Sequence, residues 1–373
     1  MKLKVRIVVF VLLANLASGC WDTEDIERRA MIEAIGLDAA EGNRVRVTLE
    51  LPALEAVLAP AAGGGDTGKT THTITAEGDS VFGAIPGLQA KSMKGLFAGQ
   101  IKGIVIGAEL ARRGLTGHLD MLDRHPKIPP QAAVFLTKGE AREILATATA
   151  LEPNPALEVS LLSTLLADQV FPVKLWRFMH DLDTGREEPE EAFLPIIAYD
   201  ARERSDILRG LGVFHGDRLV GELSGNEARM FGLLTARMGS ATVQVPVRGM
   251  GLTTYHRVKS RVKNSVHVED GRPAFLIEVH AHGFLIEMTK PRIPLDNRTD
   301  RAIEKTVARA LQGEMMKVVH KLQSLNSDIL GLGELLRAKQ PRIWERLDWN
   351  EAFPQVPVQI EVQFEMGRTG AHR

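Results

Sequence analysis

One segment of the sequence has the spacing of a phosphate-binding loop. Residues 63–70 read Gly-Gly-Gly-Asp-Thr-Gly-Lys-Thr, which satisfies the pattern G-x-x-x-x-G-K-[ST]. Phosphate binding requires such a loop to leave a strand and open a helix, because the helix N-terminus helps to hold the phosphates. Residues 55–60 are not a convincing strand, and the Thr-rich run after the loop favours a strand over a helix. We therefore interpret 63–70 as a flexible Gly-rich loop and predict no nucleotide cofactor.

Two histidines have the spacing of a pair of metal ligands. His280 and His282 lie one residue apart in a strand-like segment, which places both imidazoles on the same face. Zinc sites use three or four ligands. The sequence offers no third ligand at a matching distance, so we interpret the pair as solvent-facing histidines and predict no metal.

Acidic side chains cluster in residues 22–27 and 187–191, and paired carboxylates are the groups that hydrolases use for acid and base catalysis. Both clusters read as a helix start or a loop, where a run of charges normally forms a solvated surface. No serine or cysteine occupies a G-x-S-x-G nucleophile elbow. We predict that the chain is not an enzyme; an exported hydrolase would need a nucleophile and a base that converge in space.

The N-terminus has the layout of a secretory signal. Three basic residues precede an apolar run, 7–16, which closes on the small residues 17–19 and on Cys20, the only cysteine. The run is too short for a transmembrane helix, which needs about 20 apolar residues. The residues before Cys20 resemble a lipobox, although Ala17 stands where leucine is usual. We predict that 1–19 are removed and that Cys20 carries two or more acyl chains, since one chain anchors only marginally; the alternative is a secreted protein with a spare thiol.

The composition is that of an ordinary globular protein, with 44% hydrophobic and 25% charged residues. A chain of 373 residues exceeds what one core supports, so two or three domains are expected. Loss of Lys2, Lys4 and Arg6 with the signal changes the formal net charge from −1 to −4. This mildly acidic body argues against nucleic acid, and against anionic lipid as the main ligand.

Hydrophobic periodicity predicts an α+β, multi-domain fold with mixed and antiparallel sheets, each packed with helices. Residues 45–51 alternate apolar and polar, which indicates one buried and one wet face. Prolines between 152 and 199 indicate a solvated loop near a domain edge. The predicted strands are 31–37, 45–51, 71–76, 102–107, 131–137, 211–214 with 217–221 as a hairpin, 240–247, 255–268, 275–284 and 356–364; the predicted helices are 108–122, 140–148 and the amphipathic 301–323.

This pattern divides the chain into a signal peptide at 1–19, an N-terminal α+β region at 20–200, and a C-terminal α+β domain at 207–373 with long antiparallel strands. The N-terminal region has room for two subdomains.

Short motifs along the chain resemble the Ger(x)C family, the lipoprotein C subunit of nutrient germinant receptors in spore-forming bacteria. They lie in the expected order from the cysteine almost to the C-terminus, and that order makes the resemblance specific. The motifs are Gly19-Cys20-Trp21-Asp22 with Ile35-Gly36-Leu37-Asp38; Ile104-Val105-Ile106-Gly107 leading to Asp123-Arg124; Gly212-Val213-Phe214 with Leu219-Val220-Gly221; and Gly331-Leu332-Gly333-Glu334, Trp344, Phe353-Pro354 and Arg368-Thr369-Gly370.

The resemblance implies a lipoprotein on the outer surface of the inner spore membrane. It would work by assembly with two integral membrane subunits of the A and B type, which carry the nutrient site, and would have no enzymatic activity. The competing hypothesis is a solute-binding lipoprotein that delivers a small molecule to a transporter. Such proteins bind in a cleft between two α/β lobes, whereas the second half here has the pattern of long antiparallel strands.

Overall fold

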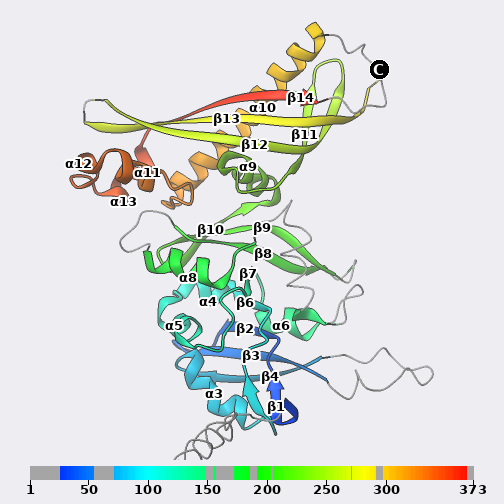
Figure 1. Ribbon diagram of the computed structural model, residues 1–373, viewed down its shortest axis with the longest axis vertical. Coiled ribbons are helices and arrows are strands. Elements are labelled where there is room, and N and C mark those ends of the chain that lie inside the picture. The colour runs from blue at the N-terminus through cyan, green and yellow to red at the C-terminus, as the bar shows by residue number, and fades with distance from the viewer. Residues whose placement is uncertain are drawn as a thin grey trace, which may run out of the picture.

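The computed structural model describes residues 26–53, 71–147, 154–156, 172–184, 191–200, 202, 205–269, 271–290 and 297–367. Two sheets are stacked along the long axis of the molecule, with α9 (Gly225–Thr235) between them (Figure 1). Among the described helices, none is long and apolar enough to cross a bilayer.

The first sheet has eight strands in the order β10-β9-β8-β7-β6-β2-β3-β4. The four strands in the middle run parallel, and antiparallel strands extend both edges. The strands are β2 (Ala34–Ala39), β3 (Val45–Pro52), β4 (Thr71–Gly78), β6 (Gly103–Gly107), β7 (Ala133–Thr137), β8 (Phe193–Asp200), β9 (Ser205–His215) and β10 (Arg218–Ser224). A short η1 (Ile26–Arg28) leads into β1 (Arg29–Met31), which pairs separately with β5 (Gly95–Phe97).

Helices cover both faces of this sheet, which explains why its central strands are uninterrupted apolar runs. In β6, Ile104 and Ile106 join a core with helices of one face, while Val105 packs with α6 on the other. The helices of the first face are α3 (Val81–Gln89), α4 (Ala108–Arg113), α5 (Thr116–Arg124) and α8 (Leu175–Thr184), and the opposite face is covered by α6 (Ala141–Ala146) (Figure 1).

The second sheet has the order β11-β12-β13-β14 and packs against the long helix α10 (Asn297–Ser324). Its first three strands are antiparallel, and β14 pairs in parallel with β13. The strands are β11 (Ala241–Val247), β12 (Gly251–Glu269), β13 (Arg272–Met288) and β14 (Val358–Gly367); the remaining short elements are α11 (Leu332–Lys339), α12 (Pro341–Trp344), α13 (Trp349–Ala352) and η2 (Phe353–Gln355).

The α+β, multi-domain prediction is confirmed, and so is the amphipathic helix, whose apolar residues are buried as its spacing requires: Ile303, Val307, Leu311, Met315, Val318 and Leu322. The predicted hairpin at 211–221 forms as β9 and β10. It pairs with β8, so the first sheet includes strands from both predicted domains.

Three expectations are wrong. The helix predicted over 108–122 is two helices, because Gly114 at φ +113° ends α4 and the Leu115 amide donates to the carbonyl of Asp217 at 3.1 Å. The proline-rich stretch before Tyr199 contains α8 and the buried strand β8. The second face of β3 is not wet, because α6 covers it; Thr48 and Glu50 on that face are fully buried.

The position of α6 depends on a buried carboxylate in the motif 35–38. Asp38 accepts hydrogen bonds from the amides of Ala141 at 2.6 Å and Arg142 at 3.0 Å, at the N-terminus of α6. A carboxylate there satisfies amides that have no partner within the helix. Gly107 leaves the necessary space, because a Cβ at this position would lie 2.4 Å from Asp38 Oδ1.

Gly107→Ala should therefore lower the free energy of unfolding by about 2 kcal/mol, because the added methyl group displaces the capping carboxylate. Urea unfolding followed by circular dichroism measures the change. The matched control is Gly117→Ala in the first turn of α5, where no atom lies within 4 Å of the new Cβ. Equal stability of the two variants would show that the space beside Asp38 is not needed.

Candidate functional site

Several sequence-predicted site residues lie outside the described residues. These are Cys20, the Gly-rich loop 63–70, residues 22–25 and residues 187–190. Their predicted roles stay predictions.

His280 and His282 share the outer face of the second sheet, as predicted. His280 is exposed, and the half-buried His282 ring packs edge-on against Phe284 at 5.0 Å. Within the described part of the chain, no group of three or more His, Cys, Asp or Glu side chains is placed to hold a metal ion.

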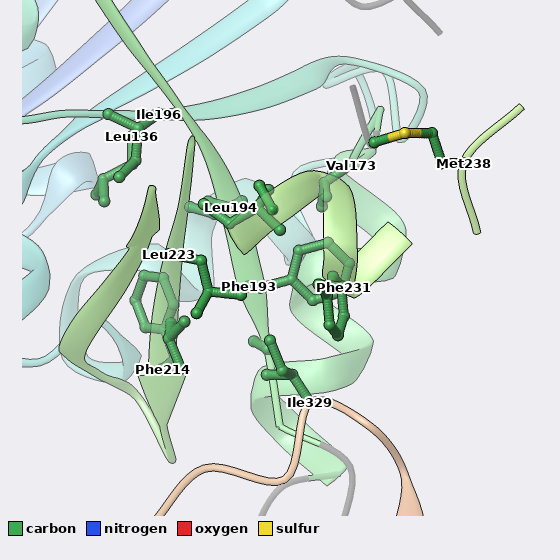
Figure 2. Packing of buried hydrophobic residues seen from close by; sticks show 14 of the residues in the cluster. Leu136, Val173, Phe193, Leu194, Ile196, Phe214, Leu223, Phe231, Met238 and Ile329 are labelled. Atoms are coloured by element: carbon green, nitrogen blue, oxygen red, sulfur yellow. The ribbon is translucent and has the colours of Figure 1, made fainter. Parts of the chain in front are cut away.

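Aromatic side chains pack at the junction where α9 lies between the two sheets. Phe231 of α9 meets Phe193 of β8 edge-to-face, with ring centres 5.4 Å apart, and Phe214 of β9 meets Phe178 of α8 at 5.5 Å. Figure 2 shows Phe193, Phe214 and Phe231 with Leu194, Leu223 and Ile329. All belong to one apolar core that continues into the second sheet. The two sheets are therefore packed as one unit.

Asp328, in the turn after α10, is a buried acid at this junction. Its buried carboxylate accepts hydrogen bonds from the amides of Leu332 at 3.1 Å and Gly333 at 2.7 Å, and from Trp349 Nε1 at 3.2 Å. Gly331 starts α11 with φ +72°, a left-handed conformation that favours glycine. Hydrogen bonds to a charged acceptor are among the stronger ones in proteins, so Asp328 fixes α11 and α13 relative to α10.

A second buried carboxylate ties the first sheet to the same turn. Glu191, just before β8, accepts from the amide of Gly216 at 2.7 Å, and its own amide donates to the Asp328 carbonyl at 3.4 Å. The Ser327 hydroxyl donates to the carbonyl of Phe214. The strand β8, the β9–β10 turn and the turn after α10 are thus joined by direct hydrogen bonds.

His215 makes a pH-sensitive contact with Glu191. Its Nδ1 lies 2.9 Å from Glu191 Oε1, and this contact with the carboxylate raises the pKa of His215. The contact of protonated His215 with Glu191 contributes fully to the stability of the fold below the ordinary histidine pKa near 6.5. This contribution is lost as the pH rises through the raised pKa of His215. The residue is partly exposed, so solvent weakens the effect.

Two of the motifs that indicated the family resemblance, 212–221 and 331–334, converge here, whereas those at 35–38 and 104–107 lie beside α6. Phe214 accepts from Ser327, and Gly221 lies against Leu325, where a Cβ would come within 2.6 Å of that side chain. The motif at 331–334 begins α11 and donates its amides to Asp328. These motif residues therefore hold the two sheets together.

Asp328→Ala should lower the free energy of unfolding by about 3 kcal/mol, because three buried donors lose a charged acceptor. Asp348→Ala is the matched control: Asp348 caps α13 through the Asn350 and Glu351 amides, at an exposed position, and its loss should cost about 1 kcal/mol. Chemical denaturation of both variants measures the difference. Similar losses would show that burial of Asp328 contributes nothing special.

Glu50 is a buried acid that the sequence analysis missed, because alternation placed it on a wet face. Its Oε1 accepts from the amide of Ala156 at 3.3 Å. Nearby, Glu33 binds Lys102 Nζ at 2.7 Å and Asn154 Nδ2 at 2.6 Å. Burial raises the pKa of Glu50 to about 8, so it is mostly protonated at neutral pH. Glu50 is fully buried and has no access to a substrate, so its role is structural.

Glu50→Gln should stabilise the protein at pH 8 by on the order of 2 kcal/mol. In wild type, the folded state keeps a proton that the unfolded state releases above about pH 4.5, so stability falls between pH 4.5 and 8. Glutamine cannot ionise, so the gain should shrink towards pH 5. Denaturation at several pH values measures the gain, with Glu361→Gln, at an exposed position of β14, as the control for net charge. A gain independent of pH would contradict the prediction.

A cavity of ≈ 320 Å³ lies beside the junction. Two of its charged residues form an ion pair, with Arg177 Nε 2.8 Å from Asp181 Oδ1. The Arg237 guanidinium lies 5.8 Å from the ring centre of Phe193. The lining therefore combines charged and apolar side chains. The lining residues are Pro172, Val173, Arg177, Asp181, Phe193 and Arg237.

The sequence and fold match known proteins over almost the whole chain. Residues 22–199 match the family described as "Spore germination protein N-terminal domain". Residues 209–370 match "Spore germination B3/GerAC like, C-terminal". The crystal structure of the GerBC protein has the same fold, with a TM-score of 0.59 over 89% of this chain and 96% of that chain, at 17% identity.

Relatives from two Bacillus species align with this chain over nearly the full length of both sequences. The protein YfkR of Bacillus subtilis (strain 168) is 26% identical, over 95% of this chain and 94% of YfkR. Spore germination protein KC of the same strain is 24% identical, over 98% and 96%. Spore germination protein GerQC of Bacillus cereus is 20% identical, over 98% and 99%. The chain therefore belongs to the Ger(x)C family of spore germination proteins.

Proposed function

We propose that this chain is the C-type subunit of a nutrient germinant receptor, held to the membrane by acyl chains on Cys20. The observation that carries this proposal is the match of both family descriptions, which together span residues 22–199 and 209–370. The N-terminal sequence supports the anchor, because a short signal-like run ends at the only cysteine.

Within this proposal the chain acts by protein contacts with integral membrane subunits on the extracytoplasmic side. The junction supports this role, because its polar groups hold two sheets in a fixed arrangement and are already engaged with backbone amides. A lipid anchor confines the chain to the plane of the membrane. Modest interfaces then become effective through the raised local concentration.

The alternative is a solute-binding lipoprotein, and the charged cavity beside the junction is its best support. Such proteins close two α/β lobes around a cleft. Here the second unit is a four-stranded, largely antiparallel sheet, and α9 packs against both sheets. We therefore favour assembly; a thermal shift with a free amino acid or sugar, lost in Arg237→Gln, would favour solute delivery instead.

Removal of the acyl anchor should release the protein from membranes and impair the response of spores to nutrients. The variant is Cys20→Ala behind a secretory signal cut by ordinary signal peptidase, so that export continues without acylation. Its control carries a lipoprotein signal from another protein and keeps Cys20. Membrane fractionation, mass spectrometry of residue 20 and germination on nutrient are the measurements. Full membrane retention and full germination of Cys20→Ala would contradict the proposal.

A further inference from the structure

The entry point of the chain fixes which residues lie closest to the anchor. Strand β1 pairs in parallel with β5, with Arg29 opposite Gly95 and Ala30 opposite Leu96. Residues 27–28 therefore lie beside 93–94, just before the paired strands. Figure 1 shows β1 and α3 together at one end of the molecule, with the second sheet at the other end.

This end carries the two most exposed large apolar side chains in the described part of the chain. Met93 is fully exposed and Phe82 is 64% exposed, compared with 53% for Ile286 and 37% for Leu252 on the second sheet. Single exposed apolar residues are ordinary, but here both lie within one short segment, 81–97.

Helix α3, which carries Phe82, has an unusual outer face. None of its nine residues is charged, and its solvent-facing positions include Phe82, Gly83, Pro86 and Gly87. A surface helix normally has charged residues opposite its buried stripe. Lys91 and Lys94 follow the helix and are exposed. Asp79, just before the helix, is also exposed, so the cations lie only on the C-terminal side. An apolar helix face with cations beside it is typical of segments that lie in a membrane interface.

The length of chain before β1 limits how far this face can be from the lipid. Cys20 precedes Ile26 by six residues, and an extended chain spans at most about 3.6 Å per residue, or roughly 20 Å. An anchor on Cys20 therefore keeps the α3 end close to the bilayer, whatever conformation the linker adopts.

We propose that α3 and the residues after it rest on the lipid surface, with Phe82 and Met93 entering the headgroup region and the second sheet pointing away. This proposal rests on the proposed function in one respect, the acyl anchor on Cys20 that holds this end near the membrane. The body has a formal net charge of −4 without residues 1–19, so the main attraction is apolar contact, and Lys91 and Lys94 add local attraction to phosphate groups. The second sheet is then available to partners that extend from the membrane.

The first experiment uses the chain from residue 20 with Cys20→Ser and an N-terminal hexahistidine tag. The tag tethers it to vesicles of phosphatidylcholine and phosphatidylglycerol that contain a nickel-chelating lipid. Cys20 is the only native cysteine, so Met93→Cys and Ile286→Cys each give one site for an environment-sensitive dye. Tethering should shift the emission of the dye to the blue at residue 93 and leave it unchanged at 286.

The second experiment removes the apolar contact. Without nickel lipid, Phe82→Ser combined with Met93→Ser should lower the partition coefficient onto the same vesicles by about tenfold. Leu252→Ser combined with Ile286→Ser is the matched control and should leave it unchanged. Circular dichroism confirms that both double variants are folded.

If tethering shifted the dye emission equally at residues 93 and 286, or at neither, the proposal would be overturned. The proposal would also be overturned if the emission of the dye at residue 93 did not change on vesicles and shifted to the blue only when integral membrane subunits were added. That result would mark residue 93 as part of a protein interface. Because the tag replaces the acyl chains, either failure leaves the acylation of Cys20 unaffected; that is decided separately by mass spectrometry.

Discussion

The structure depends on the burial of α9 between two sheets. Phe231 of this helix packs on Phe193 of the first sheet, and the Leu233 carbonyl accepts a hydrogen bond from Ser260 Oγ of the second at 2.7 Å. The apolar core is therefore continuous through the helix. Separating the sheets would expose aromatic side chains, at about 25 cal/mol for each Å² of apolar area. The orientation of the second sheet is thus set by packing.

Buried carboxylates give this packing its specificity. Asp38, Glu50, Glu191 and Asp328 each accept a hydrogen bond from at least one backbone amide. Such acids position helices and turns, because a misplaced segment would leave a buried acceptor without its donor. Asp181 differs, since it pairs with Arg177 at the wall of a cavity. Most of these buried acids therefore bind backbone amides and define the shape of the fold.

The elements that could be predicted from the sequence are those whose burial follows from their own hydrophobic spacing. The spacing of Ile303, Val307 and Leu311 specified α10, because that helix buries a single stripe. Residues 45–51 misled because their alternating polar positions are covered by α6, which no local pattern reveals. The motifs at 212–214 and 331–334 indicated the family, yet their contacts through Ser327 and Asp328 join distant segments and could not be read from either motif.

The place of β9 in the first sheet has a consequence for any attempt to divide the chain. The two family regions meet between residues 199 and 209, whereas β9 (Ser205–His215) hydrogen-bonds along β8 (Phe193–Asp200). An excised first half would present β8 as a bare edge, with unsatisfied amides and carbonyls and strongly apolar side chains. Such edges recruit strands from other molecules and aggregate. The two halves named by homology are therefore unsuited to separate expression, and a fragment ending after β10 would keep that edge covered.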